Sequence, residues 1–128
     1  MFDRQKKGDR AVLVLPHARG EADAARRDEE FAELVKSAGA EVLGRLAARV
    51  DEPNPRFYIG SGKADELAEM VRALAADLVL VDHQLSPVQE RNLERHVQAR
   101  VVDRSGLILD IFAQRARSHE GKLEVELA

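Results

Sequence analysis

The segment Gly60-Ser61-Gly62-Lys63 has the residue types best suited to binding an anion. Glycines between a predicted strand and a predicted helix leave backbone N–H groups exposed and able to donate hydrogen bonds to an anion. The lysine adds a positive charge that suits a phosphate or carboxylate. The segment is not a P-loop, because Phe57 stands where that motif needs its first glycine and Ala64 where it needs Ser or Thr. It also lacks the third glycine of a dinucleotide fingerprint. An anion or RNA-phosphate contact and a plain tight turn therefore both stay open.

Four basic residues in the second half of the chain are further candidates for phosphate contacts: Arg104, Arg115, Arg117 and Lys122. Their side chains could equally interact with the carbonyl groups at a helix C-terminus. Acids dominate residues 21–41, whereas basic residues outnumber acids in residues 91–122. That polarity fits either one basic face toward RNA or two ordinary solvated surfaces. The net charge of −3 argues against a free-standing nucleic-acid binder held by bulk electrostatics.

Catalytic chemistry finds little support in the sequence. Asp82 and Asp103 end predicted strands, where open α/β sheets bind ligands, but the first strand supplies no acid for a phosphoacceptor site. We expect both aspartates to be loop or helix N-caps. His83 beside Asp82 is a possible acid/base pair without an activated nucleophile, and the four scattered histidines and the lack of cysteine argue against a metal site. We predict no catalytic residue and no metal in this chain.

Short apolar runs alternate with helical patterns along the 128 residues. This alternation predicts one three-layer α/β domain, with a mainly parallel sheet of about four or five strands and helices on both faces. Strand order, and whether the short extended segment 57–59 pairs into the sheet, stay open. We expect an irregularity in the second strand at Gly44. The predicted strands are 11–15, 40–50, 78–81 and 100–102, and the first three predicted helices begin near residues 23, 64 and 86.

Helix boundaries are marked by specific residues. Gly39 should end the first helix, and Ser86-Pro87-x-Gln89 has the pattern of a capping box at the start of the third. Residues 106–116 are apolar almost all round, which predicts a buried helix. Residues 120–128 predict a further helix without a C-terminal cap, so we expect the chain to be truncated at the start of a long helix. The lack of a signal sequence, a membrane span or cysteine favours a cytoplasmic protein.

Several ordered motifs resemble HflX-type GTPases. The matching segments are Met1-Phe2-Asp3-Arg4, Phe57-Tyr58-Ile59-Gly60-Ser61-Gly62-Lys63-x-x-Glu66-Leu67, Leu85-Ser86-Pro87-x-Gln89-x-Arg91-Asn92-Leu93-Glu94, the run from Val102 to Ala116, and Glu120-Gly121-Lys122-Leu123-x-Val125-Glu126-Leu127-Ala128. The departures are small: Ser105 and Ser118 stand where the family pattern has Thr, and Glu124 where it has Gln. The resemblance covers nearly the whole chain in the correct order.

The resemblance implies a cytoplasmic GTPase that binds the large ribosomal subunit and acts in splitting or rescue of stalled ribosomes. Residues 1–118 would be its N-terminal α/β domain and residues 119–128 the start of a helical subdomain. GTP and Mg²⁺ would bind a Ras-like GTPase domain that this chain does not include and that would dock on it. We therefore expect a monomeric, non-catalytic domain that binds ribosomal RNA and no cofactor of its own.

Two other functions stay open. The chain could bind, or weakly hydrolyse, a nucleotide through the Gly60–Lys63 loop. It could also be a purely intramolecular regulator of the attached GTPase, with no affinity for ribosomes when isolated.

Overall fold

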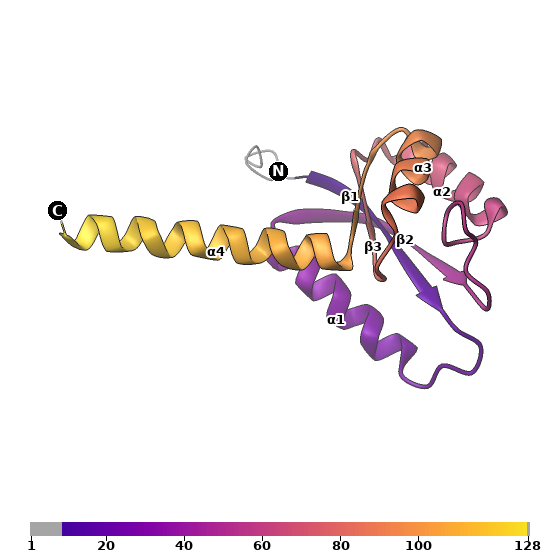
Figure 1. Ribbon diagram of the computed structural model, residues 1–128, viewed down its shortest axis with the longest axis horizontal. Coiled ribbons are helices and arrows are strands. Elements are labelled where there is room, and N and C mark those ends of the chain that lie inside the picture. Colours follow the sequence, from indigo (N-terminus) through magenta and orange to yellow (C-terminus); the bar gives the residue numbers. More distant parts are fainter. Residues whose placement is uncertain (1–8, 128) are drawn as a thin grey trace.

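Strands and helices alternate throughout the structure, a computed structural model that describes residues 9–127 (Figure 1). For Arg115 and residues 117–127 it describes the helical backbone alone. The elements are β1 (Asp9–His17), α1 (Ala24–Ser37), β2 (Ala40–Arg49), α2 (Ser61–Leu74), β3 (Leu78–Val81), α3 (Pro87–Val97), β4 (Arg100–Asp103) and α4 (Arg104–Leu127). None of the helices in residues 9–127 is both long and apolar enough to cross a lipid bilayer.

The four strands form one fully parallel sheet in the order β2-β1-β3-β4. The predicted α/β fold with a parallel sheet is therefore confirmed. From β1 the chain passes to β2 on one side of β1, and from β2 it crosses to β3 on the other side. The gap between β1 and β3 is therefore a topological switch point. Open α/β sheets bind ligands at the carboxyl end of such a gap. The segment 57–59 stays outside the sheet, and Tyr58 forms an isolated bridge with Asn54.

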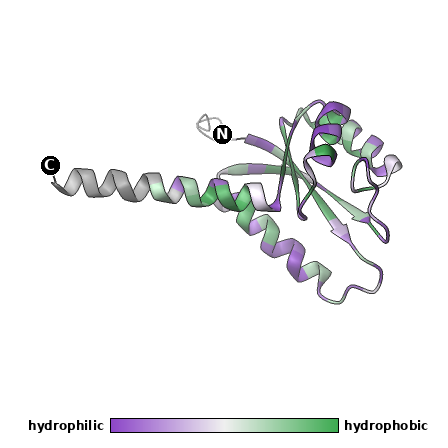
Figure 2. Cartoon of the chain, viewed as in Figure 1, coloured by the Kyte–Doolittle hydropathy of each residue, from purple (hydrophilic) through white to green (hydrophobic). Residues whose placement is uncertain are grey.

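Helices cover both faces of the sheet and bury an apolar core on each (Figures 1 and 2). Because side chains alternate along a strand, Val12 and Val14 of β1 pack toward α2 and α3, whereas Leu13 and Leu15 pack toward α1 and α4. Burial of each such side chain contributes roughly 1.5–3 kcal/mol. This two-sided burial explains why β1 is a continuous apolar run.

The predicted helix boundaries at Gly39 and Ser86 are confirmed. Gly39 follows Ala38, the C-cap of α1, and has a φ of +94°, a conformation that favours glycine. The Ser86 hydroxyl accepts a 3.1 Å hydrogen bond from the Gln89 backbone N–H, and the Gln89 side chain accepts one of 3.0 Å from the Ser86 N–H. These reciprocal bonds satisfy two donors at the start of α3.

The predicted irregularity at Gly44 is a β-bulge. Ala11 of β1 pairs with Val42 and Val12 pairs with Gly44, so Leu43 is the additional residue in β2. A Cβ atom at Gly44 would lie 3.1 Å from side-chain atoms of both Leu74 and Met70 on α2. Glycine at this position lets α2 pack closely on the bulged strand.

The C-terminal region differs from the expectation of two helices, because α4 is a single helix from Arg104 to Leu127. The expectation that residues 106–116 are buried on all sides was also wrong. Leu107 and Ile111 are buried, but Leu109 is 67% exposed and Phe112 is 61% exposed. Only one face of the first turns packs on the sheet, and the helix then extends beyond it (Figure 1). The predicted domain boundary after residue 118 falls within this helix.

Candidate functional site

Charged side chains gather at the carboxyl edge of the sheet. His17 ends β1, Arg49 ends β2, Asp82 follows β3, and Asp103 ends β4. Because all four strands are parallel, these residues share one edge, where ligands of open α/β sheets bind.

Asp82 occupies the switch point between β1 and β3. Its backbone N–H donates a 3.0 Å hydrogen bond to the Val14 carbonyl, and its side chain is 0% exposed. Arg104 donates to Asp82 Oδ1 at 3.2 Å, and Arg27 Nε lies 3.5 Å from Oδ2. Arg27 also pairs with Glu21 and donates to the Pro16 carbonyl. Within residues 9–127, the chain's own charges therefore fill this part of the edge.

The expectation that both aspartates are N-caps holds for Asp103 and fails for Asp82. Asp103 Oδ1 accepts a 2.9 Å hydrogen bond from the Gly106 N–H in the first turn of α4, and Oδ2 accepts one of 2.9 Å from the Leu85 N–H. Asp82 instead pairs with two arginines that sequence spacing does not associate with it. Burial raises the pKa of the Asp82 carboxyl above its ordinary value, and the charges of Arg104 and Arg27 oppose that rise.

The His83 ring stacks on Tyr58, with ring centres 4.4 Å apart and planes 21° from parallel. Its Nδ1 donates a 2.9 Å hydrogen bond to the Gln84 carbonyl. Tyr58 has a φ of +72°, rare for an aromatic residue, and is held by two backbone hydrogen bonds to Asn54, of 3.0 and 2.7 Å. These contacts position the His83 ring through packing rather than as an acid/base partner of Asp82.

The Gly60–Lys63 segment is the start of α2. Gly60 is the N-cap, with φ −66° and ψ 158°, and no side chain caps the helix. Neither Gly60 nor Gly62 has a positive φ, and a Cβ at either position would meet no atom within 4 Å. The two glycines are thus required neither by backbone conformation nor by packing. Lys63 Nζ lies 3.2 Å from Glu66 Oε1 on the same helix.

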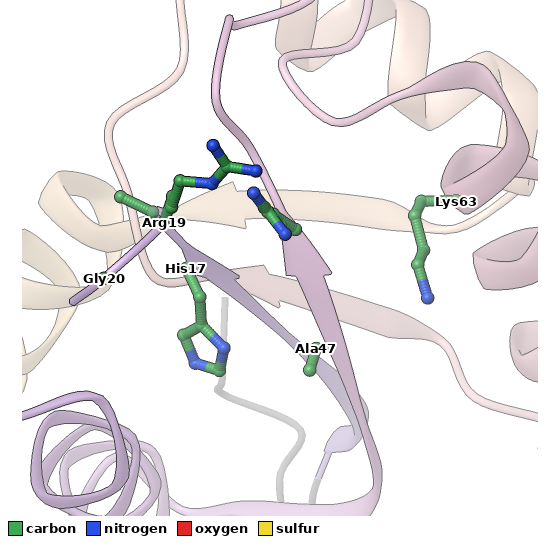
Figure 3. Close-up of a pocket in the computed structure, with 7 residues that line it drawn as sticks. His17, Arg19, Gly20, Ala47 and Lys63 are labelled. Carbon is green, nitrogen blue, oxygen red and sulfur yellow. The ribbon is translucent and has the colours of Figure 1, made fainter.

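Lys63 also lines an open cavity of about 460 Å³, here called the basic hollow (Figure 3). Its lining combines the end of β1 and the following loop with β2 and the start of α2. The lining residues are His17, Ala18, Arg19, Gly20, Ala47, Arg49 and Lys63, with no carboxylate among them. Sequence reasoning identified Lys63 but missed Arg19 and Arg49, because no local motif joins residues that come together only through the fold.

The other predicted anion-binding residues lie elsewhere. Arg104, at the start of α4, is engaged with Asp82. Arg115, Arg117 and Lys122 lie on α4, and their side chains fall outside the described part of the structure. Across residues 9–127, no group of three or more His, Cys, Asp or Glu side chains is placed to hold a metal ion.

Comparison with solved structures finds the same fold in GTP-binding proteins. The GDP complex of a protein described as SsGBP matches 93% of this chain and 33% of its own, with 26% identity and a TM-score of 0.65. A GTP-binding protein from the archaeon Sulfolobus solfataricus, also in complex with GDP, shares the fold with 24% identity and a TM-score of 0.60. That match covers 82% of this chain and 30% of the archaeal one.

Sequence comparison gives closer relatives. GTPase HflX of Escherichia coli strain K12 is 56% identical over 129 residues, which cover all of this chain and 30% of the relative. GTPase HflX of Thermococcus kodakarensis is 42% identical over 119 residues, covering 93% of this chain and 26% of the relative. The chain thus spans less than a third of these relatives' lengths. Residues 25–113 match the family model described as GTP-binding GTPase N-terminal. The chain therefore belongs to the GTP-binding GTPase N-terminal family and has the sequence and fold of an HflX-type N-terminal domain.

Proposed function

We propose that this chain is the ribosome-binding and regulatory N-terminal domain of an HflX-like GTPase. In this account it works in the cytoplasm, contacts ribosomal RNA of the large subunit, and assists the splitting or rescue of stalled ribosomes. The observation that carries the proposal is the family match over residues 25–113, together with GTPase HflX relatives aligned over the whole chain. In this account residues 1–118 would be the α/β domain and residues 119–128 would begin the helical subdomain.

The distribution of charge supports an RNA contact at the carboxyl edge. The basic hollow gathers Arg19 from a loop, Arg49 from β2 and Lys63 from α2, although the chain as a whole carries a net charge of −3. A local basic surface is sufficient to contact phosphates when other parts of a protein supply the rest of the affinity. Binding by this domain alone should therefore be weak and sensitive to salt.

We further propose that this chain does not hydrolyse GTP. It has no P-loop sequence, and side chains of the chain itself fill the switch point where an open α/β sheet would hold a nucleotide. GTP and Mg²⁺ would bind a separate GTPase domain of the whole protein, and that domain would also contact this one. The chain by itself is then a monomer without a cofactor.

Co-sedimentation with purified ribosomal subunits tests the proposal. The chain should pellet saturably with large subunits at low salt, and much less with small subunits. Failure to pellet with large subunits at any salt concentration would leave a purely intramolecular regulator as the better account.

A nucleotide-binding function for the Gly60–Lys63 loop is the second candidate. It is favoured by the uncapped start of α2 and by two glycines that neither conformation nor packing requires. Titration with GTP and ATP distinguishes the two functions. Saturable binding that Lys63→Ala abolishes would support the nucleotide site, whereas no saturable binding by either nucleotide would reject it.

A further inference from the structure

We infer that the basic hollow is a binding site for the phosphodiester backbone of RNA, with Arg19, Arg49 and Lys63 as the residues that contact phosphate groups. The inference rests on the proposed function and assigns its RNA contact to one place in the fold.

The fold brings the lining residues of the hollow together through two features, a strand register and a turn. His17 and Arg49 are partners in the register of β1 and β2, and the Val50 N–H donates a 2.9 Å hydrogen bond to the His17 carbonyl. Beyond β1 the chain turns sharply at Gly20, which has a φ of +71°. The turn is closed by a 3.2 Å hydrogen bond from the Glu21 N–H to the Ala18 carbonyl and places Arg19 at its tip.

Lys63 approaches from the start of α2. Figure 3 shows Arg19 and Lys63 on opposite sides of the hollow, with Ala47 of β2 between them. The cations therefore lie apart from one another around the hollow rather than at a single point (Figure 3). An extended chain of phosphates suits this arrangement better than a single compact anion, because the positive groups are spread across the opening.

The neighbouring carboxylates do not occupy the hollow. Asp28 Oδ2 lies 2.8 Å from His17 Nε2, Asp51 lies 3.1 Å from Arg49 Nε, and Glu66 lies 3.2 Å from Lys63 Nζ, but none of these acids lines the cavity. In the pairs of Arg49 and Lys63 the side chains are more than one-third exposed, and such pairs are worth only about 0–1 kcal/mol. A phosphate can therefore compete for these cations. The structure records no ion pair for Arg19 within residues 9–127.

The lining distinguishes a nucleic-acid backbone from a free nucleotide. Nucleotide sites bury the base against apolar or aromatic walls. Apart from the stems of its two arginines and its lysine, this hollow offers only Ala18, Gly20, Ala47 and the ring of His17, which is hydrogen-bonded to Asp28. Arginine forms paired hydrogen bonds with phosphate oxygens, which requires no contact to a base. The hollow should therefore bind RNA with little preference for sequence.

The test is fluorescence anisotropy with a labelled single-stranded RNA of mixed sequence, measured over a salt series. Arg19→Ala, Arg49→Ala and Lys63→Ala should each weaken binding by about tenfold, the loss expected for one charged hydrogen bond. Each should also lower the slope of log Kd against log salt by about 0.7. The matched control is Arg72→Ala, which removes the same charge from an exposed side chain in the last turn of α2 and should leave binding within about twofold of wild type.

The outcomes separate this inference from the proposed function. If the chain pellets with large subunits but the three variants bind RNA like Arg72→Ala, the hollow is the wrong site and the proposed function stands. If the wild-type chain does not pellet with large subunits but binds RNA, and the hollow variants lose that binding, the hollow is correct and the proposed function is wrong.

If the wild type binds no RNA, the inference fails. Competition by GTP or inorganic phosphate as strong as that by RNA, or equal affinity for polyglutamate, would also overturn the assignment to an RNA backbone.

Discussion

The buried carboxylate of Asp82 accepts a 3.2 Å hydrogen bond from Arg104, the first residue of α4. This contact ties the switch point of the sheet to the helix that leaves the domain. It also gives Arg104, a residue expected from sequence to contact phosphate, a partner within the chain. An RNA phosphate at Arg104 would have to compete with a carboxylate that is 0% exposed, whereas Arg19 has no such competitor recorded in the described part of the chain.

Stability should depend on pH through Asp82. Its folded-state pKa is raised by burial, so the stability linked to its protonated form is fully present below its ordinary pKa, about 3.9, and is lost as pH rises through the raised value. Asp82→Asn lacks this titration. We expect the free energy of unfolding of the wild type to fall relative to that of Asp82→Asn as pH rises through this window, as measured by urea unfolding at a series of pH values. A difference that is constant or rises with pH contradicts the account.

Asp103 should stabilise the junction of β4 and α4 through both carboxylate oxygens. Asp103→Ala removes the acceptors for the Gly106 and Leu85 N–H groups and should cost about 1–3 kcal/mol in urea unfolding. Asp103→Asn keeps one acceptor oxygen and should lose about half as much. Equal losses for the two substitutions would show that the hydrogen bond retained by the asparagine contributes nothing.

Two glycines should respond to alanine in opposite directions. Gly62 lies within α2 with open space at its Cβ position, so Gly62→Ala should stabilise the domain by about 0.5–1 kcal/mol. Gly39 has a φ of +94°, so Gly39→Ala should destabilise it by at least about 1 kcal/mol. Thermal unfolding measures both changes. If Gly62→Ala is also destabilising, the described conformation at the start of α2 is wrong.

The helical face of α4 that packs on the sheet can be tested with two adjacent residues. Ile111 is 6% exposed, so Ile111→Ala should cost about 2–4 kcal/mol, whereas Phe112 is 61% exposed and Phe112→Ala should change stability by less than about 1 kcal/mol. Urea unfolding of both variants decides the orientation. A larger loss at Phe112 would mean that the helix is rotated from the described position.

Local signals predicted most of the fold. Continuous apolar runs identified β1 and β3, the Ser86 capping box identified the start of α3, and Gly44 marked the bulge. Apolar content alone misplaced residues 106–116, because it does not reveal that only one face of α4 meets the sheet.

Contacts between charged residues of distant segments could not be predicted from local sequence patterns. In the sequence, β2, α2 and β3 lie between Arg27 of α1 and its partner Asp82. The basic hollow brings Arg19 and Lys63 to opposite sides of β2. Spacing along the chain carries no sign of either contact, since both depend on strand order. The parallel arrangement was predictable from the alternation of strands and helices, but the order β2-β1-β3-β4 was not.

Co-sedimentation of the chain with large ribosomal subunits across a salt series tests the central claim most directly. The account predicts saturable binding at low salt that weakens steeply as salt rises, because the contact is made by arginine and lysine to phosphate. It also predicts that Arg19→Ala weakens this binding and that Arg72→Ala does not. No binding at low salt, or binding that is indifferent to salt, would contradict an RNA-contacting role for this domain.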